Sequence, residues 1–563
     1  MSQSLPADYP PPFQSSDYVA APLAGEDEYI EVGVLVVGGG PAGLACAVRL
    51  GQLLAEDEQL MESLGEVPLA VAEKGKAYGS HLLSGACVRP QPLLDLFPDA
   101  NPDDIPHYGE VTGEAVYLMT RDRKYRIPTP PQMKNHGNWI VSVSQLGRWM
   151  SEQAEEYGAF LLPETDCQKL LVEGGRVVGV VTGDKGRGRD GEELGVFEPG
   201  VEVRAKVTVI AEGTQGHLAG VVRKHYDLDR DSTQIWELGV KEVWEVEKPL
   251  DKVIHTLGFP LRFRKKYGEY GGSWLYPMGE DKISLGFVVG LDYSDATTSV
   301  HDILQEFKTH PFIKSILKGG KRLTWGAKTI PGGGIWGLPS RLHVPGAVLV
   351  GDSAGFVDMA GLKGVNFATR SGMLAAEAIA EALSEGKAEE PAGLWGYDER
   401  IKDSEVWKEL WKVRNIRPAF QKGFVYGGMV HAISTGTMGK MPKRVRFIPD
   451  AQEPVFVGNR KYSAPDGELT FDKLSSVFAS GNQTRDDQPN HIRIQENVPE
   501  AIAVAWENMC PAKVYEVDED APKNGTVTVK LNPSNCVQCG AITAKGGQLT
   551  PPEGGSGPEY TLT

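Results

Sequence analysis

The chain has 563 residues, of which 41% are apolar and 24% charged, as in an ordinary globular protein with roughly two to four domains. The 58 basic and 75 acidic side chains give a formal charge of −17, which argues against broad attraction to nucleic acid or anionic lipid. Six cysteines are too sparse for a disulfide framework in a chain of this length, so we expect a reducing compartment.

Residues 1–29 contain a Pro-Pro-Pro run with several Ser and Asp, and we expect them to form a flexible tail. No apolar segment follows a basic start, so no secretory signal is visible. No stretch reaches the roughly 18 uninterrupted apolar residues that a membrane-spanning helix needs. We therefore expect a cytoplasmic protein.

The first motif is a strand, a glycine turn and a helix. Residues 29–37 form an apolar, β-branched run that predicts a buried strand, and Gly38-Gly39-Gly40-Pro41-Ala42-Gly43 follows it directly. In such a turn Gly38 permits the reversal, Gly40 lets the backbone approach a pyrophosphate, and Gly43 lets helix and strand pack closely. The phosphates then lie on free N–H groups of the helix. The motif predicts a dinucleotide site.

A second strand is predicted at residues 69–72. It ends in Glu73, whose carboxylate is placed to accept hydrogen bonds from a ribose hydroxyl. Glu73 lies further from Gly43 than the usual spacing of about 20 residues. We interpret the acidic stretch 56–66 as an extension of the connecting helix.

Two further segments favour FAD over NAD. Residues 207–213 predict a strand ending in a glycine turn, and residues 347–355 predict a strand ending in Gly351-Asp352. Flavoproteins with two dinucleotide folds bring such an aspartate to the ribityl or pyrophosphate part of FAD. Alternatively, these glycines only shape turns between strands and helices. That alternative is weaker because three separate segments occur in the order expected for a FAD-binding chain.

A cysteine pattern near the C-terminus lacks one member. Cys510, Cys536 and Cys539 are spaced like ferredoxin-type cluster ligands, but the next position of the x-x-Cys repeat is Ile542, which cannot bind iron. A three-iron cluster, a four-iron cluster with a water or carboxylate ligand, a zinc site and a metal-free remnant remain open. Zinc is disfavoured because structural zinc prefers four protein ligands. We expect the other cysteines to pack as small apolar residues: Cys46, Cys87 and Cys167.

Longer strings carry a family resemblance: His81-Leu82-Leu83-Ser84-Gly85-Ala86, Asn135-His136-Gly137-Asn138-Trp139-Ile140, Tyr270-Gly271-Gly272-Ser273-Trp274-Leu275-Tyr276, and residues 371–377 and 465–472. With the motifs above, they make most of the chain similar to the electron transfer flavoprotein:ubiquinone oxidoreductase family. The resemblance implies an enzyme that takes electrons from electron transfer flavoprotein and passes them through FAD and a four-iron cluster to ubiquinone or menaquinone. It also implies peripheral, non-spanning attachment to the inner face of the cell membrane.

The resemblance also implies site residues. Gly271 and Gly272 would lie against the quinone headgroup, since a backbone without β-carbons lets a flat ring approach, whereas the alternative is a glycine bulge in a sheet. Segments 126–136 and 424–441 would meet the membrane, with a solvated hairpin as the alternative for the second. The expected cofactor-binding set is Gly38, Gly40, Gly43, Glu73, Ser84, Gly85, Gly351 and Asp352.

We predict a mixed α/β fold with three parts: a FAD-binding, glutathione-reductase-like Rossmann domain of the two-dinucleotide-fold type, an intercalated sheet-based quinone domain and a C-terminal ferredoxin-like module. The FAD domain would take residues 30–105, 140–235 and 325–420, the quinone domain 106–139 and 236–324, and the iron-sulfur module 421–563. Two rival functions stay open. One is a soluble FAD-dependent reductase or hydroxylase, similar to geranylgeranyl reductases, with a lipid-like substrate; the other is a non-catalytic FAD-containing subunit.

Overall fold

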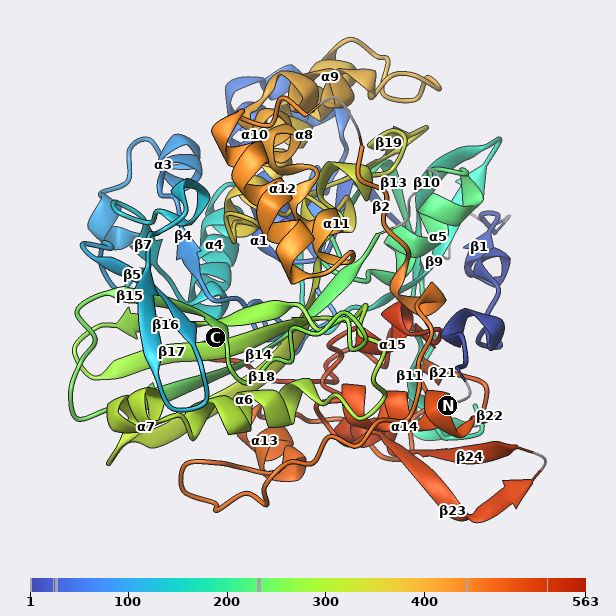
Figure 1. Ribbon diagram of the computed structural model, residues 1–563. Helices are drawn as coiled ribbons and strands as arrows, with labels where there is room; N and C mark the ends of the chain where they lie inside the picture. Colours follow the sequence, from blue (N-terminus) through green and yellow to red (C-terminus); the bar gives the residue numbers. More distant parts are fainter. Residues whose placement is uncertain (1–2, 24, 26–28, 230–233, 442–443, 524) are drawn as a thin grey trace.

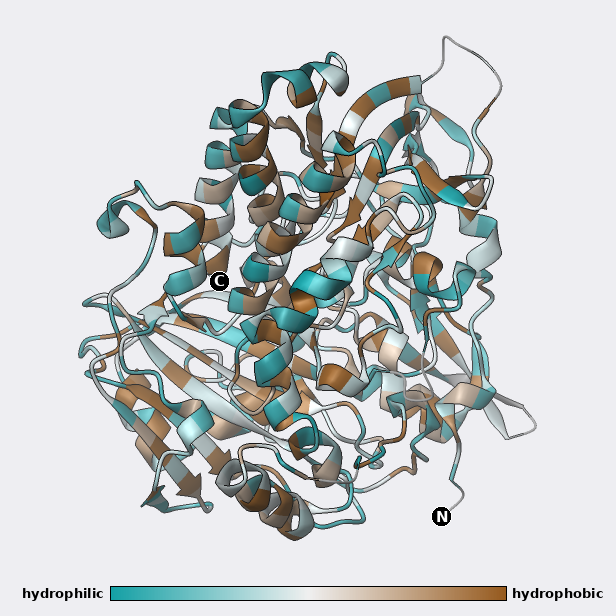
Figure 2. Ribbon diagram, turned by 90° about the horizontal axis from the view of Figure 1, so that it is seen from above, coloured by the Kyte–Doolittle hydropathy of each residue, from teal (hydrophilic) through white to brown (hydrophobic). Residues whose placement is uncertain are grey.

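A computed structural model of the protein describes residues 3–23, 25, 29–229, 234–441, 444–523 and 525–563. Two β-sheets form its centre. The first lies with long helices in the upper half of Figure 1, and the second crosses the middle, with the C-terminal part of the chain packed beneath it. Figure 2 shows the body from above, where apolar residues recur along the strands and the helices beside them.

The first sheet contains the predicted dinucleotide-binding strands. Its spatial order is β1 (Val19–Ala20), β9 (Cys167–Glu173), β10 (Arg176–Thr182), β13 (Glu202–Ile210), β2 (Tyr29–Val37), β3 (Leu69–Ala72) and β8 (Phe160–Leu162), with β20 (Ala347–Leu349) and β19 (His343–Val344) beside β13. The central pairs are parallel, and helices α1 (Pro41–Glu56) and α8 (Val365–Ser384) pack together beside them. The predicted mixed α/β fold is confirmed.

The connection between β2 and β3 corrects one prediction. The acidic stretch 56–66 does not extend the first helix, because α1 ends at Glu56 and a separate helix, α2 (Glu58–Ser63), follows. Asp57 separates them: its carboxylate accepts a hydrogen bond from the Leu60 N–H at 3.0 Å and caps α2.

The two faces of the second sheet pack against different parts of the chain. Its spatial order is β18 (Lys321–Pro331), β14 (Trp236–Glu245), β17 (Lys282–Gly290), β16 (Gly271–Met278), β15 (Val253–Gly258), β5 (Glu114–Met119) and β6 (Lys124–Ile127). Side chains alternate along a strand, so Leu238 and Val240 of β14 enter an apolar core on one face. Gly239 and Lys241 lie on the other face, toward the first sheet.

The apolar face of the second sheet shares its core with the C-terminal part of the chain. Helices α6 (Val300–Lys308) and α13 (Lys473–Ala479) contact its strands, and one apolar cluster joins Leu285 and Phe287 of β17 to Ile502 and Trp506 of α14 (Glu500–Met509). The C-terminal residues therefore pack as one body with this sheet. The predicted domain boundary at residue 421 falls between α11 (Ile416–Phe420) and α12 (Phe424–Gly436), which pack against each other.

The described part of residues 1–29 differs from the expected flexible tail. β1 pairs in parallel with β9, and the Ser4 N–H donates to the Val455 carbonyl at 3.0 Å. Tyr18 also packs edge-on against His217, with 4.5 Å between the ring centroids. Backbone pairing and aromatic contact hold this segment to the body, which the composition of the segment alone does not reveal.

Lys308→Met should destabilise the fold, because Glu242 would lose the nearer cation of a fully buried ion pair. The Lys308 Nζ lies 2.8 Å from Glu242 Oε2, and neither side chain is exposed. Leaving a buried charge wholly unpaired costs about 3–5 kcal/mol. Because Arg322 stays 3.6 Å from Glu242 Oε1, we expect a smaller loss, seen as a lower urea midpoint of unfolding followed by tryptophan fluorescence. The double variant Lys308→Met/Glu242→Leu should lose less stability than Lys308→Met; an equal or larger loss contradicts this account.

Candidate functional site

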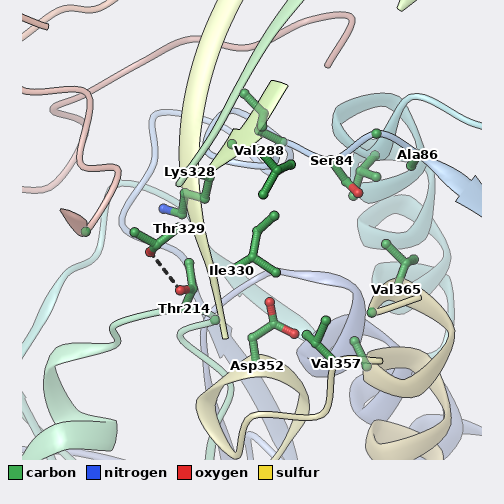
Figure 3. Close-up of a pocket in the computed structure, with 18 of the residues that line it drawn as sticks. Ser84, Ala86, Thr214, Val288, Lys328, Thr329, Ile330, Asp352, Val357 and Val365 are labelled. Atoms are coloured by element: carbon green, nitrogen blue, oxygen red, sulfur yellow. Dashed lines mark hydrogen bonds between the residues drawn. The ribbon is translucent and has the colours of Figure 1, made fainter. Parts of the chain in front are cut away.

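A cavity of about 560 Å³ lies between the two sheets, a volume typical of cofactor and small-molecule sites. Its lining includes the N-terminus of α1, the loop of residues 82–88, Gly271 and Gly272, and part of α12. Figure 3 shows part of this cavity, where Ile330 of the second sheet lies opposite Asp352, which follows β20 of the first sheet. One space therefore joins the positions predicted for the dinucleotide and for the quinone.

The glycines of the turn before α1 have two roles: two allow close packing, and one leaves room for a ligand. Gly38 has φ +112°, and a β-carbon there would lie 2.4 Å from the Ala211 carbonyl oxygen. A β-carbon at Gly43 would lie 2.1 Å from the carbonyl oxygen of Gly38, so both positions need glycine for close packing. Gly40 borders the cavity, and the nearest atom to its β-carbon position is Leu82 Cδ2 at 3.6 Å. No described side chain caps α1, so its first N–H groups are free for phosphate.

Glu73 is held against this turn at the end of β3. Its Oε2 accepts a hydrogen bond from the Gly39 N–H at 2.9 Å, and its Oε1 accepts one from the Gly75 N–H at 2.7 Å. The carboxylate lines the cavity, and each oxygen has a second lone pair. It can therefore still accept a hydrogen bond from a ribose hydroxyl.

Gly351 and Asp352 follow β20 in the turn η6 (Gly351–Ser353) and have different roles. Asp352 lines the cavity, and burial raises the pKa of its carboxyl to about 6, although the charge of Lys328 acts in the opposite direction. Gly351 has φ +56°, and a β-carbon there would lie 2.7 Å from Ala42 Cβ. Gly351 thus allows this turn to pack closely against α1, while Asp352 faces the cavity.

The loop of Ser84 and Gly85 is held from the second sheet. Lys241 Nζ donates to the Ser84 carbonyl at 2.7 Å, and Ser284 Oγ donates to the Gly85 carbonyl at 2.6 Å. A β-carbon at Gly85 would lie 3.1 Å from the Tyr276 ring. Sequence reasoning assigned nothing to Lys241 or Ser284; their only signal is alternation with buried apolar residues along β14 and β17.

Gly271 and Gly272 line the cavity, but the sheet itself requires glycine there. A β-carbon at Gly271, where φ is +154°, would lie 1.9 Å from the Val288 carbonyl oxygen. At Gly272 it would lie 2.7 Å from the Thr256 carbonyl oxygen. The close strands thus account for both glycines, and the ligand contact stays a prediction.

A buried pair lies beside these glycines. His255 Nε2 is 2.8 Å from the Tyr276 hydroxyl, and both side chains line the cavity. Burial, assisted by the charge of Lys363, lowers the pKa of His255 to about 3, so the ring is neutral at physiological pH. A neutral imidazole can present either a donor or an acceptor to a ligand in the cavity.

The three predicted cluster cysteines lie together in the C-terminal part of the chain. Backbone N–H groups donate to the Sγ atoms of Cys510 and Cys536 at 3.4 Å. Burial raises the pKa of Cys536 and of Cys539 to about 12, and the charge of a neighbouring cysteine of the set is the next largest cause for each. The described residues contain no group of three or more His, Cys, Asp or Glu arranged for one metal ion.

An iron-sulfur cluster places other demands on these thiols, because its thiolates bind separate iron atoms. Three of the four usual donors are present. The fourth position, Ile542 in α15 (Ala541–Ala544), is buried in the apolar core, where it borders Ile494 and Gly547. The residues therefore fit a cluster held by three cysteines.

Hydrogen bonds join the cysteine loop to the cavity wall. Lys74, the neighbour of Glu73, donates from Nζ to Gln538 Oε1 at 2.5 Å. The backbone N–H and Oγ1 of Thr329 donate to the Cys539 carbonyl at 2.8 and 2.9 Å. Thr329 also contacts the Thr214 hydroxyl at 2.9 Å, drawn as the dashed line in Figure 3. The sequence showed Gln538 between two cysteines but not its partners.

Helix α12 borders the far end of the cavity with one face and exposes another. Phe424, Gly428 and His431 line the cavity. Val425, Met429 and Ile433, which recur every four residues, are 74%, 54% and 53% exposed. None of the described helices is both long and apolar enough to cross a membrane.

Two family models match the chain. One, described as ETF-QO, ubiquinone-binding, matches residues 236–330, which include the second-sheet strands that line the cavity. The other, described as Electron transfer flavoprotein-ubiquinone oxidoreductase, 4Fe-4S, matches residues 467–561, which include the three cysteines.

Solved structures support the flavoprotein fold. A geranylgeranyl bacteriochlorophyll reductase-like protein from Thermoplasma acidophilum aligns with a TM-score of 0.54 and 20% identity over 73% of this chain and 90% of its own. The flavin-dependent brominase Bmp2 aligns with a TM-score of 0.50 and 18% identity over 73% of this chain and 93% of its own. At such identities the likeness concerns the fold alone, so it does not favour the rival reductase function.

Sequence relatives match almost the whole chain. The electron transfer flavoprotein-ubiquinone oxidoreductase of Pseudomonas aeruginosa is 38% identical over 95% of this chain and 99% of its own length. The mitochondrial electron transfer flavoprotein-ubiquinone oxidoreductase of Oryza sativa subsp. japonica is 36% identical over 96% of this chain and 94% of its own length. The mitochondrial protein of the same name from Rattus norvegicus is 38% identical over 94% of this chain and 89% of its own length. The match of the 4Fe-4S model supports an iron-sulfur cluster as one cofactor. The uncapped start of α1, with Glu73 beside it, suits the dinucleotide part of FAD. The chain belongs to the electron transfer flavoprotein-ubiquinone oxidoreductase family.

Proposed function

We propose that this chain relays electrons from reduced electron transfer flavoprotein, through an iron-sulfur cluster and FAD, to ubiquinone or a related quinone. The main support for this proposal is that one cavity is lined by both α1 and α12 and that the cysteine loop is hydrogen-bonded to its wall. A reductase of lipid-like substrates has no need for three cysteines at this wall. A non-catalytic subunit has no need for a cavity that reaches a surface helix.

FAD supplies the redox chemistry when bound, and the chain supplies the groups that hold it. The free N–H groups behind Gly40 would bind the pyrophosphate, Glu73 the ribose, and Asp352 the ribityl or pyrophosphate part. Gly38, Gly43 and Gly351 act by keeping these elements close together, while Ser84 and Gly85 would border the ring end of the cofactor.

The cluster in this chain would be a three-iron cluster on Cys510, Cys536 and Cys539, since Ile542 has no lone pair to donate. The other cysteines belong to distant segments: Cys46 to α1, Cys87 to the strand Cys87–Val88 and Cys167 to β9. The backbone N–H groups at two of the sulfurs would stabilise the thiolate form. This departs from the four-iron cluster that the family model is named for.

The quinone would bind near Gly271 and Gly272 and arrive from a lipid surface along α12. An exposed apolar stripe on a helix that also borders the cavity suits peripheral attachment, with the stripe in the headgroup region. The other predicted contact, residues 126–136, also reaches the cavity, through Pro130 and Met133. We place this surface at the cytoplasmic, inner face of the cell membrane.

Val288→Phe should impair the quinone step selectively. Val288 pairs with Gly272 across neighbouring strands and lines the cavity, so a larger ring would occupy the space proposed for the quinone. With purified holoenzyme and reduced electron transfer flavoprotein, kcat/KM for a ubiquinone analogue should fall about tenfold, the effect of roughly 1.4 kcal/mol. FAD content and FAD reduction by the partner should not change, and Val288→Ile should show a smaller loss. Equal loss of both half-reactions would place the quinone elsewhere.

Ile542→Cys should convert the cluster to a four-iron form, because it completes the donor set. We expect about three irons per wild-type chain and an electron paramagnetic resonance signal in the oxidised state. The variant should contain about four irons, be silent when oxidised and give a signal after reduction. Thr543→Cys, which adds a thiol at the neighbouring position, is the matched control. Iron-free wild-type protein after reconstitution would instead identify the cysteines as a remnant.

Met429→Glu/Ile433→Glu should abolish binding to liposomes, because two carboxylates would replace most of the exposed stripe on α12. Sedimentation with vesicles of bacterial phospholipid measures this. Phe478→Glu is the control, since Phe478 is 90% exposed on α13, outside the stripe. Undiminished binding of the double variant would rule α12 out as the contact.

A further inference from the structure

Among the described residues, Lys241 is a buried lysine without a counter-charge. Its side chain is completely buried in β14, and within the described chain its Nζ makes one hydrogen bond, to the Ser84 carbonyl. Two other buried cations pair with carboxylates: Lys308 with Glu242 at 2.8 Å, and Arg417 with Asp292 at 2.8 Å. Buried Lys363 and Lys545, like Lys241, instead donate to carbonyl or amide oxygens. No described carboxylate forms an ion pair with Lys241. Burying a charge without a partner is costly, and titratable groups buried in this way cluster at functional sites.

The position of Lys241 links the second sheet to the cavity. Its neighbours across the strands are Gly286 and Gly326, so neither cross-strand partner places a side chain beside it. The side chain of Trp274 packs over Gly286, and that of Leu83, from the loop above, packs over Gly326. Ser84 borders the cavity, as Figure 3 shows, and the ammonium group lies directly behind its carbonyl. The next carbonyl, of Gly85, is held by the neutral hydroxyl of Ser284. One loop therefore has a charged anchor and a neutral anchor side by side.

We propose that Lys241 is a positioning residue that keeps a positive charge behind the flavin loop and so stabilises the negative charge that reduction brings to FAD. The inference rests on the proposed binding of FAD in this cavity. Two electrons from the reduced partner flavoprotein and one proton convert FAD to a reduced form with one extra negative charge. In a site shielded from water, a fixed cation nearby favours that form and raises the reduction potential. Burial alone lowers the pKa of Lys241 to about 7, and the charge on reduced FAD would favour its protonated state.

The test compares Lys241→Met with Ser284→Ala in the purified holoenzyme. Each variant removes one anchor of the same loop, but only the first removes a charge. In a spectroelectrochemical titration, the ratio of reduced to oxidised FAD at a fixed potential should fall at least tenfold in Lys241→Met, a shift of about 30 mV for a two-electron couple. Ser284→Ala should change this ratio much less than tenfold. FAD content should stay at the wild-type level in both.

Equal shifts in the two variants, or no shift in Lys241→Met with FAD bound, would overturn the proposal. Lys241→Gln, which keeps a hydrogen-bond donor without the charge, should reproduce the shift of Lys241→Met; a wild-type potential in Lys241→Gln would also overturn it. Loss of FAD from both Lys241 variants would assign the residue to cofactor retention instead. Wild-type protein without FAD would contradict the proposed function itself, so the two failures are distinguishable.

Discussion

Strict alternation of side chains along the second sheet is the constraint on which the rest of the structure depends. One set of residues on β14, represented by Leu238 and Val240, builds the core shared with the C-terminal helices. The other set faces the first sheet: Gly239 lines the floor of the cavity, and Lys241 holds the Ser84 carbonyl of the loop that borders it. A register slip by one residue would exchange the two faces. The fold is thus specified by the same pairing that builds the site.

This floor brings two distant parts of the chain to one place. β18 contributes Ile330 to the middle of the cavity, and the preceding Thr329 binds the carbonyl of Cys539. On the other side, Lys74 follows Glu73 directly and binds Gln538, between two of the cysteines. Glu73, Lys74 and Gln538 therefore link the glycine turn before α1 to the cysteine loop. Such an arrangement fixes the distance and orientation between cofactors, which is what a protein contributes to electron transfer.

The sequence was informative where local pattern and chemistry coincide. An apolar run followed by glycines placed β2 and α1, and Glu73 lies beside that turn as expected. The only sequence signal for the helix break at Asp57 is that aspartate is a common capping residue, and it stands there among other acidic residues. The docking of Tyr18 on His217 and the burial of Lys241 depend on partners far away in the chain. No local propensity encodes such partners, because they follow from register and topology.

The cavity and the outer surface meet at α12, where neither face of the helix is strongly charged. Phe424 and Gly428 border the cavity, while Val425 and Met429, one position further along, are exposed. A 3.6-residue period separates these sets onto different faces of one helix. A lipid-soluble ligand can move along such a helix without crossing a charged barrier, whereas a charged face would impose a desolvation cost on one side. The sequence of α12 is not apolar enough to indicate membrane contact by itself. Its lack of charged residues is nevertheless consistent with a helix that borders both an apolar ligand and an apolar surface.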